Sequence, residues 1–199
     1  MNGAEQMVEQ PADMNAAPAT AVAVKSRLLA GLLVVQIIVG FEFFWSVIAK
    51  LVRGGFVTGL GADLQARVQA APGLYASFAN HVVIPHAKVF AYIIIAGEFF
   101  IGITMIVTAI VWLVRWDRLL LSVRSTLAVL IALAAAGAFL LNLNFHIANG
   151  ARNPWQIGAS AFVEAVDINM VLTLVDATIL VVMVAIFVSL RGSRRQTGD

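Results

Sequence analysis

The feature that most constrains this chain is an apolar run from Pro85 to Val114 that contains one carboxylate, Glu98. A helix of about 20 apolar residues crosses the hydrocarbon core of a bilayer, so this run predicts a transmembrane span. Glu98 lies about 14 Å along the helix from Val89, near the membrane midplane. An ionisable side chain at that depth costs about 3 kcal/mol or more unless it finds a partner or water. Glu98 is therefore a candidate functional residue; the alternative is a protonated acid that only joins two helices.

Composition sets the class of protein. Of the 199 residues, 61% are hydrophobic and 12% are charged, and the charged fraction is about half of that in soluble domains. Four apolar runs predict an all-α integral membrane protein, a four-transmembrane-helix antiparallel bundle. The formal charge of +2 is too small to indicate a nucleic-acid partner. Cysteine is absent, which excludes a disulfide and a thiolate metal site within this chain.

The predicted organisation is one membrane domain between two tails. Residues 1–24 are rich in alanine, proline and acids and lack a periodic apolar face, which predicts a disordered tail. Small residues precede Lys25 and Arg27, the reverse of a secretory signal, so the first span is expected to stay as an anchor. The bundle is expected over 25–191, followed by a basic tail over 192–199. Its helices are expected at about 26–48, 85–114, 119–145 and 158–190.

The connection from Gly54 to His86 is amphipathic. Apolar residues recur there at helical spacing beside polar ones, which predicts two short interfacial helices between the first two spans. These helices could cover one mouth of the bundle. The apolar positions are Leu60, Leu64, Val68, Leu74, Phe78 and Val82.

Basic residues beside the spans predict the orientation, because lysine and arginine are enriched on the cytoplasmic side. That side is expected to hold Lys25, Arg27, Arg115, Arg118, Arg124, Arg191, Arg194 and Arg195, against Lys50, Arg53, Arg67, Lys88 and Arg152 outside. Both termini are then cytoplasmic. All three histidines, with Asn142 and Asn144, fall at the outer mouth.

A second carboxylate, Glu42, lies about 9 Å inside the end of the first span, on the face of the helix that carries small and polar residues. We expect Glu42 and Glu98 to approach each other across the first two spans, with at least one of them protonated at neutral pH. Lys50 is near enough to be a counter-charge for Glu42, although it lies most of a quarter turn away. A lysine that extends to the interface is an equal alternative.

Polar residues also mark the last two spans. Asn142 and His146 are four residues apart and share a face of the third helix, beside Asn144. In the fourth helix, Glu164 and Asp167 are expected in the opening turns, and Asp176 lies near the middle. Asn169, Thr173 and Asp176 form a polar row. A protonated aspartic acid that bridges two helices is the favoured interpretation of Asp176, and a proton-relay acid is the alternative.

Three segments resemble the DoxX/DoxD-like family, the small membrane subunits associated with thiosulfate:quinone oxidoreductase. The similar features are Phe41 and Glu42 ahead of Lys50 and Leu51, Pro85 to Phe90, Gly97 with Glu98, and Asn142, Asn144 and Phe145 in the sequence LNLNF. The resemblance implies a multi-pass protein of the bacterial cytoplasmic membrane that works near the quinone pool, often with a second subunit. The fourth helix departs from the family pattern.

A quinone site needs an apolar slot and a few groups that hydrogen-bond or give protons at the carbonyl oxygens. The candidates are Glu42 and Glu98 for proton exchange, Lys50, Asn142, Asn144 and His146 for binding, and Asp176 as a possible relay. Neither haem nor metal is expected, since His81, His86 and His146 lack regular ligand spacing. Two other functions remain open: a non-catalytic membrane partner of another protein, and a proton-coupled carrier, which the lack of an internal repeat disfavours.

Overall fold

The computed structural model describes residues 16–115, 118–150 and 167–197. Its α-helices are α1 (Ala16–Arg53), α2 (Phe56–Arg67), α3 (Gly73–Phe78), α4 (Ala87–Arg115), α5 (Leu121–Ala148) and α6 (Ile168–Thr197). A 3-10 turn, η1 (Val68–Ala70), and a π-helical turn, η2 (Ala79–Val83), connect the short helices. Four helices are long and apolar enough to cross a membrane, over Leu28–Arg53, Ala87–Arg115, Leu121–Ala148 and Ile168–Gly192. The predicted all-α bundle with four spans is confirmed.

Helices α1 and α6 begin at other residues than the sequence predicts. Helix α1 already begins at Ala16, inside the segment 1–24 that was predicted as a tail. Helix α6 begins at Ile168, because the preceding Asp167 lies outside the helix and binds its first amides. Asp167 is therefore not inside the opening turns, and Glu164 lies outside the described residues.

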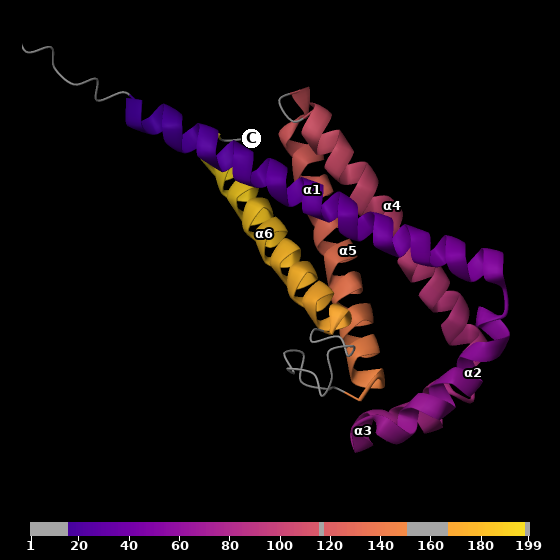
Figure 1. The fold of residues 1–199 in the computed structure, drawn as a ribbon. Coiled ribbons are helices and arrows are strands. Elements are labelled where there is room, and N and C mark those ends of the chain that lie inside the picture. The colour runs from indigo at the N-terminus through magenta and orange to yellow at the C-terminus, as the bar shows by residue number, and fades with distance from the viewer. Residues whose placement is uncertain (1–15, 116–117, 151–166, 198–199) are drawn as a thin grey trace, which may run out of the picture.

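The four spans form two packed pairs, α1 with α4 and α5 with α6, and the pairs contact each other through α4 and α5. Helix α1 packs along α4, α6 packs along α5, and α4 contacts α5 (Figure 1). Along the contact between α1 and α4, residue numbers rise in one helix as they fall in the other: Gln36 meets Met105, Gly40 meets Gly102, and Lys50 meets Glu98. The first two spans are therefore antiparallel.

Glycines set the close approach of α1 and α4. A Cβ atom added at Gly102 would lie 2.8 Å from the backbone nitrogen of Phe44 and 2.9 Å from the carbonyl oxygen of Gly40. One added at Gly40 would lie 2.8 Å from the Met105 Cβ. In lipid, where apolar burial drives helix association weakly, such backbone contact supplies much of the packing energy. This crossing fixes the register of the residues that follow on both helices.

Small residues also form the centre of α5. Ala134, Ala135 and Ala138 are fully buried, as is Ile131, in a core that includes Ile179 and Met183 of α6. Outward-facing residues of the same helices, such as Leu133 and Leu140 of α5, are exposed apolar side chains suited to lipid. The bundle is thus packed inside and apolar outside.

The excursion between α1 and α4 forms the predicted short helices, which lie across one end of α4 (Figure 1). Leu60 and Leu64 of α2 are buried against Ala91 of α4, as their spacing predicts. Leu74 of α3 is 91% exposed and Phe78 is also exposed. Helix α2 therefore packs on the bundle, whereas α3 presents apolar side chains outward.

Candidate functional site

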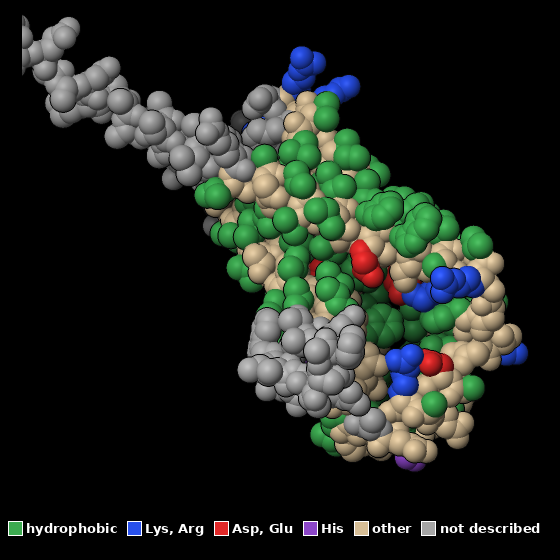
Figure 2. Space-filling view, viewed as in Figure 1, with side chains coloured by type: hydrophobic (Ala, Val, Ile, Leu, Met, Phe, Trp, Pro, Cys, Tyr) green, Lys and Arg blue, Asp and Glu red, His purple; other side chains and the backbone are tan. Residues whose placement is uncertain are grey.

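A cavity of about 470 Å³, within the size range of ligand sites, is lined by residues of α1 to α5 and by Asn169 of α6. Figure 2 shows it as a hollow with apolar walls and with acidic and basic side chains at its edge. Its polar lining residues are Glu42, Ser46, Lys50, Asp63, Arg67, Tyr75, Glu98, Asn142, Asn144, Asn149 and Asn169. Most of these lie near one end of the spans, as the sequence predicts.

The ion pair between Lys50 and Glu98 is the most buried charged feature of the cavity. Lys50 Nζ lies 2.5 Å from both carboxylate oxygens of Glu98 and donates to the Ser46 hydroxyl at 2.8 Å. The Glu98 side chain is 2% exposed and that of Lys50 17%. Lys50 is therefore turned into the protein as a counter-charge, and its partner is Glu98 rather than Glu42.

Helix geometry explains this pairing. Side chains lean toward the N-terminus of their own helix, so in antiparallel helices the two side chains lean in opposite directions. Lys50 leans back along α1 toward Ser46, and Glu98 leans back along α4 toward the start of that helix. The glycine crossing brings the two backbones close, and the two charged ends meet although their Cα atoms are not level.

Glu42 occupies the edge of the same cavity and is exposed. It interacts electrostatically with both Glu98 and Lys50. The structure therefore brings the two predicted carboxylates to one cavity, together with Lys50. Glu42 is the more exposed of the two acids, and Glu98 is the buried one.

At the opposite wall, Tyr75 of α3 donates a hydrogen bond to the side-chain oxygen of Asn144, at 3.1 Å. Burial raises the pKa of the Tyr75 phenol, and the hydrogen bond with Asn144 partly offsets that rise. The phenol is thus a neutral donor at physiological pH. With its oxygen engaged, Asn144 keeps its amide N–H groups for a ligand.

A second polar contact joins the short helices to α5. Arg67 of α2 donates to Asn149 at 2.6 Å and pairs with Asp63, whose carboxylate oxygen lies 2.8 Å from Arg67 Nε. Arg67 and Tyr75 therefore both hold the α2–α3 excursion against the end of α5. This encloses the cavity on the side away from α1.

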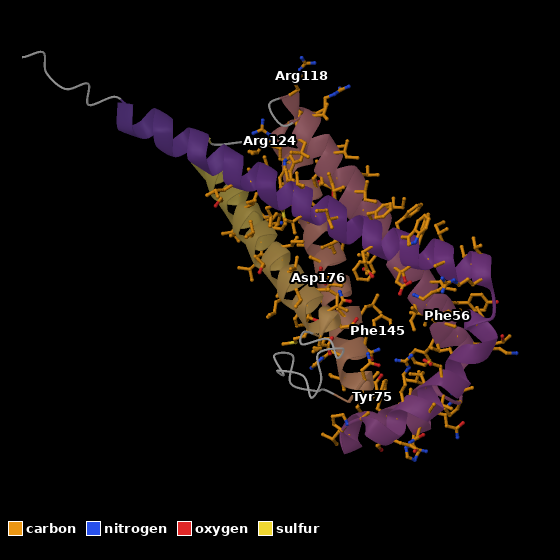
Figure 3. The ribbon with its side chains drawn as sticks, in the orientation of Figure 1. Phe56, Tyr75, Arg118, Arg124, Phe145 and Asp176 are labelled. Atoms are coloured by element: carbon orange, nitrogen blue, oxygen red, sulfur yellow. The ribbon has the colours of Figure 1, made fainter. Side chains whose placement is uncertain are left out.

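Aromatic rings form much of the remaining wall. Lys50 Nζ lies 5.0 Å from the ring centroid of Phe56, a cation–π contact. Phe43, Phe90 and Phe145 also line the cavity. Figure 3 shows Phe56, Tyr75 and Phe145 coming from three different elements around the same space. Flat apolar walls beside a few polar groups suit a planar ring ligand.

Asp176 lies beside the cavity rather than in its wall. It is completely buried on α6, and its Oδ2 accepts a hydrogen bond from Asn142, at 2.8 Å. Its other carboxylate oxygen has no hydrogen-bond partner. Asn142 lines the cavity, so it is the group that separates Asp176 from it. Thr173, in the same polar row, is also buried.

His146 pairs with Asp167 and is not among the residues that line the cavity. Its Nδ1 lies 2.7 Å from Asp167 Oδ2. The other carboxylate oxygen of Asp167 accepts from the backbone amides of Asn169, at 2.9 Å, and Met170, at 3.3 Å. Asp167 is thus the N-terminal cap of α6 and also connects α6 to α5.

Removing this cap is expected to destabilise the protein. Burial raises the pKa of the Asp167 carboxyl, but hydrogen bonds from His146 and from the backbone amides of Met170 and Asn169 outweigh it, and the net shift is downward. Asp167→Ala should cost about 1–2 kcal/mol at pH 7, measured by unfolding in detergent. The difference from wild type should persist down to about pH 4 and shrink as pH falls through the lowered pKa.

The exposed acid Asp63 supplies the control for that measurement. Asp63→Ala removes a carboxylate from a solvent-exposed ion pair and should change stability by about 0.5 kcal/mol or less. Equal stability of Asp167→Ala and wild type at pH 7 would contradict the capping role.

Of the candidate residues, the structure brings Glu42, Lys50, Glu98, Asn142 and Asn144 to one cavity, and it leaves His146 and Asp176 outside the wall. His81 and His86 are exposed. Across the described ranges, no group of three or more histidine, aspartate or glutamate side chains could hold a metal ion.

Several polar residues of the cavity wall were not among the candidates from the sequence, and two of them, Tyr75 and Arg67, bind residues of α5 or its end. The four-residue spacing of Asp63 and Arg67 indicates a helical ion pair. Tyr75 follows Leu74 in the short amphipathic helix, where a phenol is suited to a boundary between protein and membrane. Neither pattern gives the contact with α5, because that contact depends on how the excursion folds back.

Comparisons of this chain with protein-family models, with curated proteins and with solved structures find no match. The residues and their geometry are therefore the basis for a function.

Proposed function

We propose that this chain is the membrane subunit of a quinone-linked oxidoreductase, similar to the DoxX/DoxD-like proteins, and that its cavity binds the quinone ring. The observation that carries the proposal is a buried ion pair, Lys50 with Glu98, in the wall of an aromatic-lined cavity within the membrane spans. A buried charge pair is a costly way to hold two helices together, so its presence at a cavity favours a functional role.

The polar groups are placed where a quinone needs them. A quinone has two carbonyl oxygens on opposite sides of a flat ring, each of which accepts hydrogen bonds. The Asn144 amide lies on the α5 wall beside Tyr75, and the Lys50 ammonium lies on the α1 wall over Phe56. One donor at each side of the cavity would orient the ring, and the phenylalanine side chains would contact its faces.

Carboxylates would supply the proton route. Reduction of a quinone to a quinol takes up two electrons and two protons. Glu42, exposed at the cavity edge, would exchange protons with water, and Glu98 would exchange them inside the cavity. Asp176 would be a further acid behind Asn142. The electron donor is assigned to a second polypeptide, as the family resemblance implies.

In this proposal the protein lies in a bacterial cytoplasmic membrane with both termini in the cytoplasm. The cavity then opens near the outer face. The support for this orientation is the larger number of basic residues at the α1 start, at the α4–α5 connection and at the α6 end.

Filling the cavity tests the proposal. Asn144→Phe removes the amide donor and occupies ring space, so quinone reduction in membranes that contain the protein and its natural partners should fall about tenfold or more. Crosslinking by a photoreactive quinone should fall in parallel. In wild type, the crosslinked peptides should come from the cavity segments, 42–50, 63–75 and 141–149.

Leu140→Phe is the matched control, because Leu140 is one helical turn earlier on α5 and is 63% exposed. It should leave both readouts unchanged. If wild-type membranes lack quinone reduction and the crosslinks scatter over exposed apolar residues, the proposal is wrong and a non-catalytic docking role gains support.

A further inference from the structure

We propose that the groove between the start of α5 and the end of α6 binds an anionic phospholipid, with the phosphate at Arg191 and one acyl chain along the apolar floor. This groove lies at the opposite end of the spans from the cavity described above. It therefore does not depend on the proposed quinone function.

Two adjoining hollows share one arginine. The first, of about 350 Å³, is lined by Ser122, Ser125, Thr126, Val129, Leu130, Phe187 and Arg191. The second, of about 280 Å³, is lined by Phe187, Val188, Arg191 and Gly192. The Arg191 guanidinium lies over the Phe187 ring, 4.4 Å from its centroid, between the two hollows. Stacking holds this long side chain at the groove instead of leaving it free in solvent.

The charge of Arg191 is not balanced within the described parts of the chain. The ion pairs formed there include Lys50–Glu98, Arg67–Asp63 and His146–Asp167, and none of these three involves Arg191. Arg191 is exposed, and its planar guanidinium is suited to bidentate contact with a phosphate. The sequence adds Arg194 and Arg195 just beyond it, which increases positive charge at this end. An anionic ligand is the complementary one.

Depth distinguishes a lipid from a soluble anion. The α5 span begins at Leu121 and the α6 span ends at Gly192, so Ser122 and Arg191 lie at the membrane boundary. Thr126 lies about 6 Å deeper than Ser122, and Val129 and Leu130 lie deeper still. Phe187 is about 6 Å deeper than Arg191. The lining therefore changes from guanidinium and hydroxyl groups to apolar side chains in the order of a phospholipid's phosphate, ester groups and acyl chain.

The test uses the full-length protein in nanodiscs of phosphatidylcholine and phosphatidylglycerol, followed by native mass spectrometry of the lipid retained. Wild type should retain phosphatidylglycerol about tenfold over its share of the bilayer. Arg191→Gln, and separately Ser125→Leu, should reduce that enrichment to about twofold or less, while circular dichroism shows the fold intact.

Arg53→Gln is the matched control, because Arg53 is an exposed arginine at the opposite end of α1 from the groove. It should keep the wild-type enrichment. Equal loss in Arg53→Gln and Arg191→Gln would show a general charge effect and overturn the site, as would equal retention of the two lipids by wild type. Inorganic phosphate should not displace the lipid; displacement would show that the groove binds a soluble anion instead.

Discussion

Gly102→Val is expected to lower the free energy of unfolding by about 3 kcal/mol or more and to separate α1 from α4. The added Cβ would lie 2.8 Å from the Phe44 nitrogen and 2.9 Å from the Gly40 oxygen, both of them backbone atoms that cannot rotate away. Because the same crossing sets the register of Lys50 and Glu98, the cavity should be lost with it. Unfolding in detergent, followed by circular dichroism, measures the effect.

Gly97→Val is the control for the same substitution in the same helix. No atom lies within 4 Å of a Cβ atom built at Gly97, beyond its own helical neighbourhood. Its stability should stay within about 0.5 kcal/mol of wild type. If the two variants are equally stable, the close crossing of α1 and α4 does not exist as described.

Lys50→Met is expected to cost about 3–5 kcal/mol, because it leaves the Glu98 carboxylate buried without its counter-charge. The double variant Lys50→Met with Glu98→Gln removes both charges and should recover most of that loss. Lys88→Met, at an exposed lysine of α4, should have little effect and controls for the substitution itself. A double variant no more stable than Lys50→Met would show that the ion pair is not the source of the effect.

The same double variant separates stability from chemistry. It restores the fold but lacks both the buried acid and the Lys50 ammonium that is proposed to orient the quinone, so quinone-dependent turnover should fall about 100-fold. Full turnover in this stable variant would remove Glu98 from the proton route. Turnover is measured in membranes with natural partners at equal protein levels.

Some features of this protein follow from the sequence because they depend on local composition. The length and hydropathy of the four runs are enough to require membrane spans, since unpaired backbone groups are costly in lipid. A carboxylate at position 98 must then lie inside a span whatever the packing. The spacing of Leu60 and Leu64 likewise predicts a helix with one buried face, which packs on Ala91. The start of α6 after Asp167 was not predicted, because the sequence does not distinguish an aspartate that caps a helix from one within its first turn.

Tertiary structure decided which polar groups meet. Rotation along α1 leaves Lys50 a poor partner for Glu42, yet Lys50 reaches Glu98 because the Gly40–Gly102 crossing brings antiparallel helices close and both side chains lean toward each other. His146 faces Asp167 instead of the cavity. Tyr75 meets Asn144 across 69 residues of sequence only because the α2–α3 excursion folds back onto α5. Hydropathy fixes the depth of a residue along its own helix, and the partner it finds depends on the rotation and crossing of two helices, which no single segment encodes.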